Sequence, residues 1–262
     1  MKRCPSIFRT APCQATFLAA VFILLVSGLP WVSAQGSDPE ALSILARVDA
    51  NQSFKTIYYE GSMEIRSGSR IKVKTMKAWA SGKEKAFIEF TNPEDRGVRF
   101  LKLDKSLWMY FPKEKDTVKI SGALLRQGLM GSDLSYEDAM ESDSLLSDYS
   151  ARKLGQEDLE GRKTVVLELE AKDDTASYAK RKLWIDPERW VVLKSELYAR
   201  SGLLLKTSRT LEVRLVGSRH FPATVVLSDA LRKDSRTLVS MSSIILDKPI
   251  EPSRFSLQSL TR

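Results

Sequence analysis

Histidine, the side chain most often used for acid and base chemistry near neutral pH, occurs once in this chain of 262 residues. His220 is followed by Phe221-Pro222 at the start of a predicted strand. We find no His-x-His metal motif, no Ser-His-Asp triad and no other recognisable pair of nucleophile and base. The sequence therefore predicts a protein that is not an enzyme, and a histidine beside a proline turn is typical of a surface or packing residue.

Carboxylates are most concentrated in one short stretch, which contains Asp133, Glu137, Asp138, Glu141 and Asp143. Carboxylate oxygens are suitable ligands for calcium, but the spacing matches no EF-hand loop and lacks its glycine. We expect no bound metal and no cofactor, and interpret the stretch as a solvated helix face or a dock for a basic partner. Strand-borne carboxylate pairs for glycoside hydrolysis leave no local signature, and nothing in the sequence indicates them.

Large apolar side chains are the remaining candidates for a binding function. Aromatic residues occur in or beside predicted strands at Trp79, Phe87, Phe90, Phe100, Trp108, Tyr110, Phe111, Trp184 and Trp190. A segment rich in leucine and methionine lies between the two groups of strands. Flexible side chains on a curved sheet that faces short helices could form an apolar pocket, while an ordinary core between sheet and helices is the alternative.

The elements that must position these residues are mostly strands. Asp38-Pro39 supplies an N-cap and a first-turn proline for an amphipathic helix that extends to about Asn51. Apolar residues alternate with polar ones from Phe54 onward, which predicts a hairpin or meander. Further strands are predicted at Ala86–Phe90, Val98–Leu103, Leu107–Phe111, Thr117–Ile120, Thr164–Leu169, Arg181–Ile185, Val191–Tyr198, Leu203–Leu215, Thr224–Leu227 and Thr237–Leu246.

Gly122 to about Asp143 interrupts this alternation with short pieces of helical spacing. The turns between neighbouring strands are short, which favours antiparallel pairing. The sequence thus predicts a mainly β (α+β) fold with a helical insertion between two β halves. Without a repeat or a long linker, residues 35–262 are expected to form one domain.

The first 34 residues have the features of a cleaved secretory signal. Basic residues precede the apolar run Ala15–Leu29, and small residues at Val32-Ser33-Ala34 predict cleavage after Ala34. An uncleaved anchor is the alternative, although no stop-transfer pattern follows. Cys4 and Cys13 both precede the apolar run, so we expect a mature protein without thiols and without an acylatable cysteine.

The formal net charge is +8, but basic residues alternate with acidic ones, as in Lys83-Glu84-Lys85. The sequence lacks a basic stripe with interleaved aromatic residues, so we expect no nucleic-acid partner. Attraction to anionic lipid head groups is a better use of this charge in an exported protein, and a solvated surface without a specific partner is the alternative.

The order of several motifs resembles a known family. Trp79 lies on a predicted strand, Asn92-Pro93 follows it, and Asp104-Lys105-Ser106-Leu107-Trp108-Met109-Tyr110-Phe111-Pro112 comes before the helical insertion. The closing segment contains Pro249-Ile250-Glu251-Pro252 and ends at Leu257. This arrangement resembles the LolA/LolB family of lipoprotein-localisation factors, and most specifically so from Trp79 to Pro112.

The resemblance implies an open, half-closed antiparallel β-barrel whose concave apolar face is covered by a lid of short helices. It further implies a periplasmic carrier that ferries acylated lipoproteins toward the outer membrane, with an inner-membrane exporter and an outer-membrane acceptor as partners. One departure concerns the family's latch arginine, three residues after the strand tryptophan. Gly82 occupies that position here, with Lys83 next, so that latch is not carried over.

A soluble carrier needs an apolar cavity, because exposing an acyl chain to water costs about 0.8 kcal/mol per methylene. We predict that ten residues line it: Met63, Ile65, Val73, Trp79, Trp108, Tyr110, Leu124, Leu125, Leu129 and Met130. Which alternating face of each strand points inward stays open, and an error of one residue exchanges the whole set.

Other functions also remain open at this stage. The protein could carry another envelope lipid, in which case it would not need a lipoprotein exporter. It could also be a non-enzymatic envelope or surface binding protein, such as an adhesin or a stress sensor, with only peripheral contact to a membrane.

Overall fold

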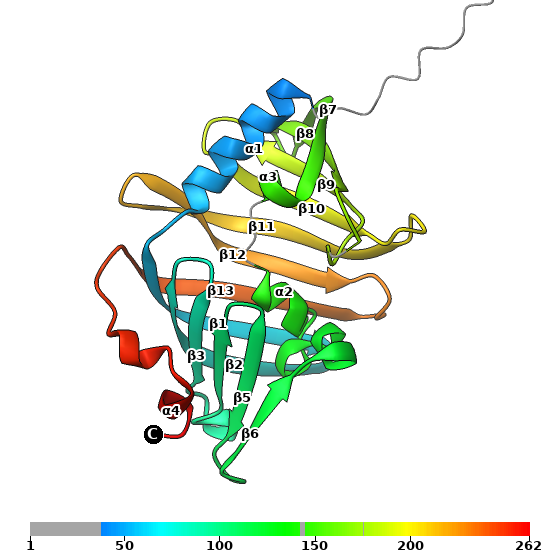
Figure 1. The fold of residues 1–262 in the computed structure, drawn as a ribbon. Helices are drawn as coiled ribbons and strands as arrows, with labels where there is room; N and C mark the ends of the chain where they lie inside the picture. The colour runs from blue at the N-terminus through cyan, green and yellow to red at the C-terminus, as the bar shows by residue number, and fades with distance from the viewer. Residues whose placement is uncertain (1–37, 142–144, 175) are drawn as a thin grey trace, which may run out of the picture. The chain divides into compact units, whose positions relative to one another are not determined.

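The computed structural model describes residues 38–141, 145–174 and 176–262, and thirteen strands of these residues form one antiparallel sheet (Figure 1). The strands are β1 (Thr56–Ser67), β2 (Arg70–Ser81), β3 (Lys85–Phe90), β4 (Arg99–Leu103), β5 (Ser106–Phe111), β6 (Asp116–Ile120), β7 (Tyr149–Leu159), β8 (Arg162–Ala171), β9 (Lys180–Asp186), β10 (Val191–Tyr198), β11 (Leu204–Val216), β12 (Arg219–Asp229) and β13 (Ser235–Leu246). The predicted signal segment, residues 1–34, lies outside the described residues.

Two meanders make up the sheet. The strand order is β6-β5-β4-β3-β2-β1-β13-β12-β11-β10-β9-β8-β7, so strands that pair are consecutive in sequence except where β1 meets β13. That junction aligns Met63 with Val239 and Ile65 with Thr237. Because β6 and β7 remain the two edges, the sheet does not close, and the predicted mainly β, open barrel-like fold is confirmed.

The helices are short apart from the first. They are α1 (Pro39–Gln52), α2 (Tyr136–Met140), α3 (Leu145–Asp148) and α4 (Leu257–Leu260), with 3-10 turns η1 (Pro93–Asp95), η2 (Gly122–Arg126), η3 (Leu129–Gly131) and η4 (Pro252–Arg254). Helix α1 begins as its sequence predicts, because the Asp38 carboxylate caps it by accepting a hydrogen bond from the Glu40 amide at 2.9 Å.

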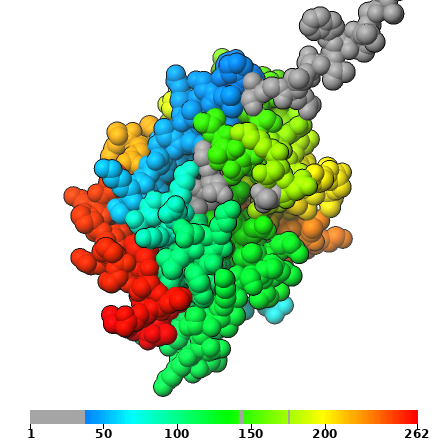
Figure 2. Space-filling model, in the orientation of Figure 1, coloured from blue at the N-terminus to red at the C-terminus, as the bar shows by residue number. Residues whose placement is uncertain are grey.

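The sheet has an apolar core on both of its faces. On the face that we call inner, α1 packs against β7, β8 and β9, with Leu45, Leu167 and Ile185 fully buried. A second inner cluster covers β1 to β6 beneath the chain that follows β6. The outer face carries a third cluster, where the C-terminal segment, red in Figure 2, places Phe255 and Leu260 against β3, β4 and β5.

Strand β7 is absent from the sequence-based prediction. Apolar and polar residues alternate poorly along β7, because it is an edge strand whose second half, after Leu154, is mostly exposed and polar. Only Tyr149 and Ala151 are buried, and both contact the cluster under α1. The short apolar part of β7 was therefore too brief to signal a strand.

Candidate functional site

The inner face of β1 to β6 is an apolar surface built from every second residue of its strands. Met63 and Ile65 come from β1, and Met76 follows on β2. The same cluster continues over the next strands with Phe90, Phe100, Leu107, Met109 and Ile120. All of these side chains are at least nine-tenths buried, although the sheet itself covers them from only one side.

The chain between β6 and β7 covers this surface from the other side. We call residues 121–141, which include η2, η3 and α2, the lid. Its apolar side chains that face the sheet are Leu125, Leu129, Met130, Leu134, Tyr136 and Met140. The Tyr136 ring lies 5.8 Å from the Phe100 ring, and the predicted helical insertion is thus an apolar cover.

Methionine is concentrated between the lid and the sheet. Five of the chain's seven methionines belong to this cluster: Met63, Met76, Met109, Met130 and Met140. Methionine has three rotatable bonds and a polarizable thioether, so a surface rich in it can repack around different apolar partners. An interface of this composition tolerates exchange of one apolar occupant for another.

Backbone contacts within the lid stabilise a narrow loop at residues 128–135. Gly128 forms a bridge with Ser135, and the Leu129 amide donates to the Leu134 carbonyl at 2.7 Å. A Cβ atom on Gly128 would lie 2.1 Å from the Ser132 carbonyl oxygen. Glycine is therefore required here by the close approach of two backbone segments.

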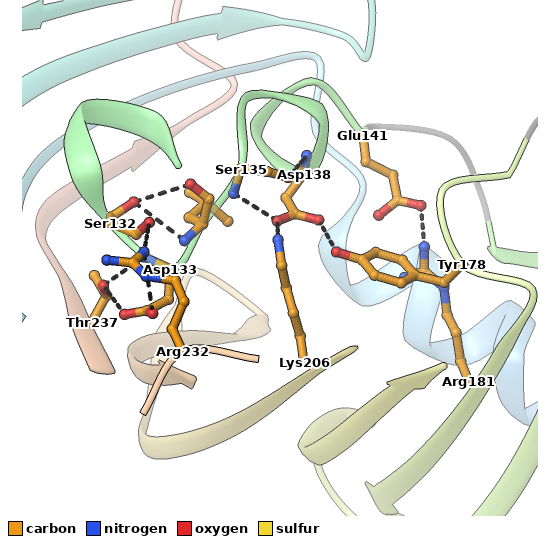
Figure 3. A network of polar contacts seen from close by, with 11 residues as sticks. Ser132, Asp133, Ser135, Asp138, Glu141, Tyr178, Arg181, Lys206, Arg232 and Thr237 are labelled. Atoms are coloured by element: carbon orange, nitrogen blue, oxygen red, sulfur yellow. Dashed lines mark hydrogen bonds and ion pairs between the residues drawn. The ribbon is translucent and has the colours of Figure 1, made fainter. Parts of the chain in front are cut away.

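The polar side of the lid is attached to the other half of the sheet through three carboxylates (Figure 3). The first, Asp133, is buried and accepts hydrogen bonds from the Ser235 hydroxyl at 2.6 Å and the Thr237 hydroxyl at 2.7 Å. Its own amide donates to the Thr237 oxygen at 2.9 Å. This carboxylate thereby fixes the loop before α2 to the start of β13.

Asp138, the second carboxylate, forms an ion pair with Lys206 of β11 and accepts a hydrogen bond of 2.5 Å from the Tyr178 hydroxyl. It also completes a capping box with Ser135 at the start of α2. Burial opposes its ionisation, but the Lys206 ammonium and these hydrogen bonds lower the pKa of Asp138 overall. Burial and the Asp138 charge together raise the pKa of Tyr178.

Glu141, the third, forms an ion pair with Arg181 of β9. The Arg181 guanidinium is buried and lies over the rings of Tyr149 and Tyr178, at 4.8 and 5.2 Å from their centroids. Burial outweighs the attraction of Arg181 and raises the pKa of Glu141. We call the three carboxylates and their partners Thr237, Lys206, Tyr178 and Arg181 the latch.

Lys102 adds a fourth attachment for the lid. Its buried ammonium donates hydrogen bonds of 2.7 Å to the carbonyls of Lys83 and Met140. The turn at Gly82 and Lys83, which lacks the family's latch arginine, is therefore joined to the end of α2 through a lysine from β4. A cleft of about 680 Å³ beside it is mostly polar, with Glu137 among its lining residues.

The latch differs from the sequence-based interpretation of the acidic stretch. Asp133, Asp138 and Glu141 are paired inside the chain, so they are neither a solvated face nor a free dock for a basic partner. Asp143 lies outside the described residues. The sequence signals the carboxylates but not their partners, which lie 40 to 104 positions further along the chain.

The ten predicted cavity residues divide into three sets. The lid and the inner face bring together Met63, Ile65, Leu125, Leu129 and Met130. The outer-face cluster contains Trp79, Trp108 and Tyr110. Val73 and Leu124 are exposed, at 56% and 41% of their surface. The division follows from the strand period of two, because Trp79 lies an odd number of residues from Met76 and so points to the opposite face.

The outer-face aromatic residues bind a part of the chain itself. Trp79 packs edge-on against Phe87 with ring centroids 6.0 Å apart, and the Arg254 guanidinium lies 4.1 Å from the Trp79 ring. Phe255 and Leu260 complete this contact. The motif around Trp108 therefore positions the C-terminal segment. The inner-face residues that the sequence-based prediction omitted include Met76, Phe90, Phe100, Leu107, Met109 and Ile120.

Neither a metal centre nor a spanning helix is found in the described part of the chain. Residues 38–141, 145–174 and 176–262 contain no group of three or more side chains suited to hold a metal ion. Among the same residues, no helix is both long and apolar enough to cross a membrane.

Solved structures show that the fold of this chain is LolA-like. A DUF1329 family protein from Desulfovibrio piger has a TM-score of 0.79 at 20% identity, covering 86% of this chain and 99% of its own. A domain from Vibrio parahaemolyticus, described as an outer membrane lipoprotein-sorting protein, has a TM-score of 0.76 at 22% identity, covering 85% and 99%. A LolA superfamily protein from Nitrosomonas europaea has a TM-score of 0.70 at 23% identity, covering 84% and 98%.

The sequence itself matches a family model described as "Uncharacterized protein" over residues 82–262, and the chain belongs to this family. No curated protein matches the chain. The resemblance to LolA-like proteins seen in the motifs is thus confirmed at the level of fold.

Proposed function

We propose that this protein is a non-enzymatic periplasmic carrier that binds the acyl chains of lipoproteins between its lid and the inner face of β1 to β6. One observation carries this proposal: a methionine-rich apolar face is covered by a separate segment that is joined to the strands by side-chain contacts, and its three carboxylates all bind the other half of the sheet. The cover can therefore leave the apolar face without taking strands apart.

An acyl chain would replace the lid's apolar side chains on the inner face. Each methylene transferred from water gains about 0.8 kcal/mol, so a chain of some 14 carbons gains roughly 11 kcal/mol. That gain offsets the loss of contacts made by Leu129 and Met130, since the chain restores the burial of Met63 and Phe100. The lid then closes over the chain or stays displaced, according to the length of the cargo.

The shared fold supports lipoproteins as the class of cargo. One structure with this fold is described as an outer membrane lipoprotein-sorting protein, and the predicted signal at residues 1–34 fits export. In this proposal residues 35–262 form the carrier domain, an inner-membrane exporter loads it and an outer-membrane acceptor unloads it. Another envelope lipid is the alternative cargo, and the test below separates the two.

A disulfide that locks the lid tests the proposal. The mature chain has no cysteine, so a pair can be introduced without background. The Asp133 amide lies 2.9 Å from the Thr237 hydroxyl, which limits the Cα separation to roughly 6 Å, within the range of a disulfide. We expect Asp133→Cys/Thr237→Cys to bind a fluorescent fatty acid when reduced and to lose at least tenfold in affinity when oxidised.

A second pair serves as the matched control. The hydroxyls of Thr75 and Thr91 lie 2.7 Å apart, away from the lid, so the Thr75→Cys/Thr91→Cys disulfide should leave binding unchanged. Native mass spectrometry of detergent-free protein and organic extraction then identify the cargo as lipoprotein or phospholipid. Equal binding by both oxidised variants, or a protein that stays empty when offered both lipids, would refute the carrier.

A further inference from the structure

Two hairpin tips meet at one end of the central strands of the sheet. The β1–β2 turn and the β12–β13 turn, the latter drawn in orange at the right of Figure 1, are joined where the Gly68 amide donates to the Asp234 carbonyl at 2.9 Å. The strands beside them pair Ser67 with Ser235 and Arg66 with Arg236. We call residues 66–73 and 229–236 the tip surface.

Three large apolar side chains are exposed on the tip surface. Ile71 and Val73 of β2 expose 48% and 56% of their surface, and Leu231 in the β12–β13 turn exposes 62%. A leucine at the end of a turn contributes nothing to the core. Exposed apolar side chains grouped at one place on a protein indicate a binding surface.

Basic residues flank these apolar side chains along the sequence of the tip surface. The tip surface has six basic side chains and two acidic ones, the basic ones being Arg66, Arg70, Lys72, Arg232, Lys233 and Arg236. Lys72 and Lys233 are exposed, and no salt bridge involves either of them within the described residues. Both are therefore available to an external anion.

We propose that the tip surface docks this protein on an anionic lipid bilayer. Phospholipid head groups provide a layer of negative charge for the lysines and arginines, and the acyl region just beneath accepts Leu231, Ile71 and Val73. A bilayer satisfies both features at once, which a purely acidic or purely apolar partner would not. The inference rests on the proposed function only in that a lipid carrier must approach membranes.

Flotation of the purified protein with vesicles tests the docking. We expect at least tenfold tighter binding to vesicles of phosphatidylglycerol and phosphatidylethanolamine than to phosphatidylcholine, with a loss of binding as salt rises. Charge reversal in Lys72→Glu/Lys233→Glu should weaken binding at least tenfold. Leu231→Ser should also weaken it, because the variant keeps the charge but loses the inserting side chain.

Matched controls lie at the opposite ends of the strands. Lys105→Glu/Lys163→Glu makes the same change in net charge in the β4–β5 turn and beside the β7–β8 turn, and Leu215 is 61% exposed near the β11–β12 turn. The control variants Lys105→Glu/Lys163→Glu and Leu215→Ser should bind vesicles within twofold of the unchanged protein. All four variants alter exposed side chains, and circular dichroism checks their fold.

Equal losses in tip and control variants would show attraction by net charge alone and would overturn the docking surface. Vesicle binding that is unchanged in the tip variants would also overturn it. Fatty-acid binding is measured on the same samples. If the unchanged protein binds fatty acid but does not bind the anionic vesicles, only the tip surface is refuted, whereas vesicle docking without fatty-acid binding refutes only the carrier.

Discussion

Asp138 is the residue that best shows how the lid is held. Its carboxylate meets Lys206 and Tyr178 on the sheet side, and Ser135 on the lid side, in a site where it and Lys206 are at least 86% buried. Removing one member of such a pair leaves the other charge buried without a counter-charge, which costs roughly 3–5 kcal/mol when the site cannot open. In the proposed carrier the lid opens, so the cost would appear first as opening.

Asp138→Asn should therefore loosen the lid while the sheet stays folded. We expect fatty-acid binding to become at least tenfold faster and hydrogen exchange to increase in residues 127–141, with little change in β8 and β9. Lys206→Met, which also removes the buried ammonium, should partly restore protection in the Asp138→Asn background. Loss of protection over the whole sheet in the single variant would contradict a local latch.

Gly128 gives a second prediction at this scale. The Cβ of Gly128→Ala would collide with the Ser132 carbonyl, so the loop between η2 and α2 must shift and Leu129 must leave its buried position. We expect a loss of stability of about 1–3 kcal/mol by urea unfolding, as for an overpacked core. Gly131→Ala, at a position with open space around its Cβ but φ near +83°, should cost about 1 kcal/mol from backbone strain.

At the scale of elements, the ion pairs of Asp138 in α2 and of Glu141 just after it respond to pH in opposite directions. The pKa of Asp138 is lowered in the folded protein, so its contribution to stability is present above its unfolded pKa of about 3.9 and is lost as the pH falls below it. The pKa of Glu141 is raised, so protonation favours the folded state as the pH falls through that raised pKa.

Urea unfolding at several pH values checks this opposition. The difference in free energy of unfolding between the unchanged protein and Asp138→Asn should shrink as the pH drops from 5 toward 3, values that bracket the usual pKa of about 3.9. For Glu141→Gln, the difference in free energy of unfolding should instead shift in favour of the unchanged protein as the pH falls toward about 4.3, the usual pKa of glutamate. Parallel trends for both variants would contradict the assigned pKa directions.

The elements also show where sequence reasoning works and where it stops. Alternation in β1, β2 and β5 predicted strands correctly, and capping by Asp38 located α1. The choice of face could not be made, because Trp79 and Met76 both lie on a strand with apolar side chains on each side. The C-terminal segment covers the aromatic residues of the outer face around Trp79, and such long-range packing leaves no local periodicity.

At the scale of the whole molecule, one arginine links the proposed cargo site to the proposed membrane contact. Arg232 belongs to the tip surface, and its guanidinium donates to the Ser132 carbonyl at 3.0 Å and lies 3.6 Å from the Asp133 carboxylate. Its side chain is 39% exposed, so a lipid phosphate can reach it. A phosphate that took the guanidinium from Asp133 would weaken the attachment of the lid and would thereby couple docking to release.

This coupling predicts that anionic membranes accelerate unloading. A fluorescent fatty acid bound to the unchanged protein should leave at least fivefold faster with phosphatidylglycerol vesicles than with phosphatidylcholine vesicles. Arg232→Ala should abolish that ratio, because Asp133 is then held by Ser235 and Thr237 alone and no guanidinium remains for the phosphate to remove. Arg236→Ala removes an exposed cation of the same tip, for which no salt bridge is found within the described residues, and should keep the ratio. If both variants preserve it, the tip surface binds membranes without controlling the lid, and if both lose it, the effect reflects docking alone.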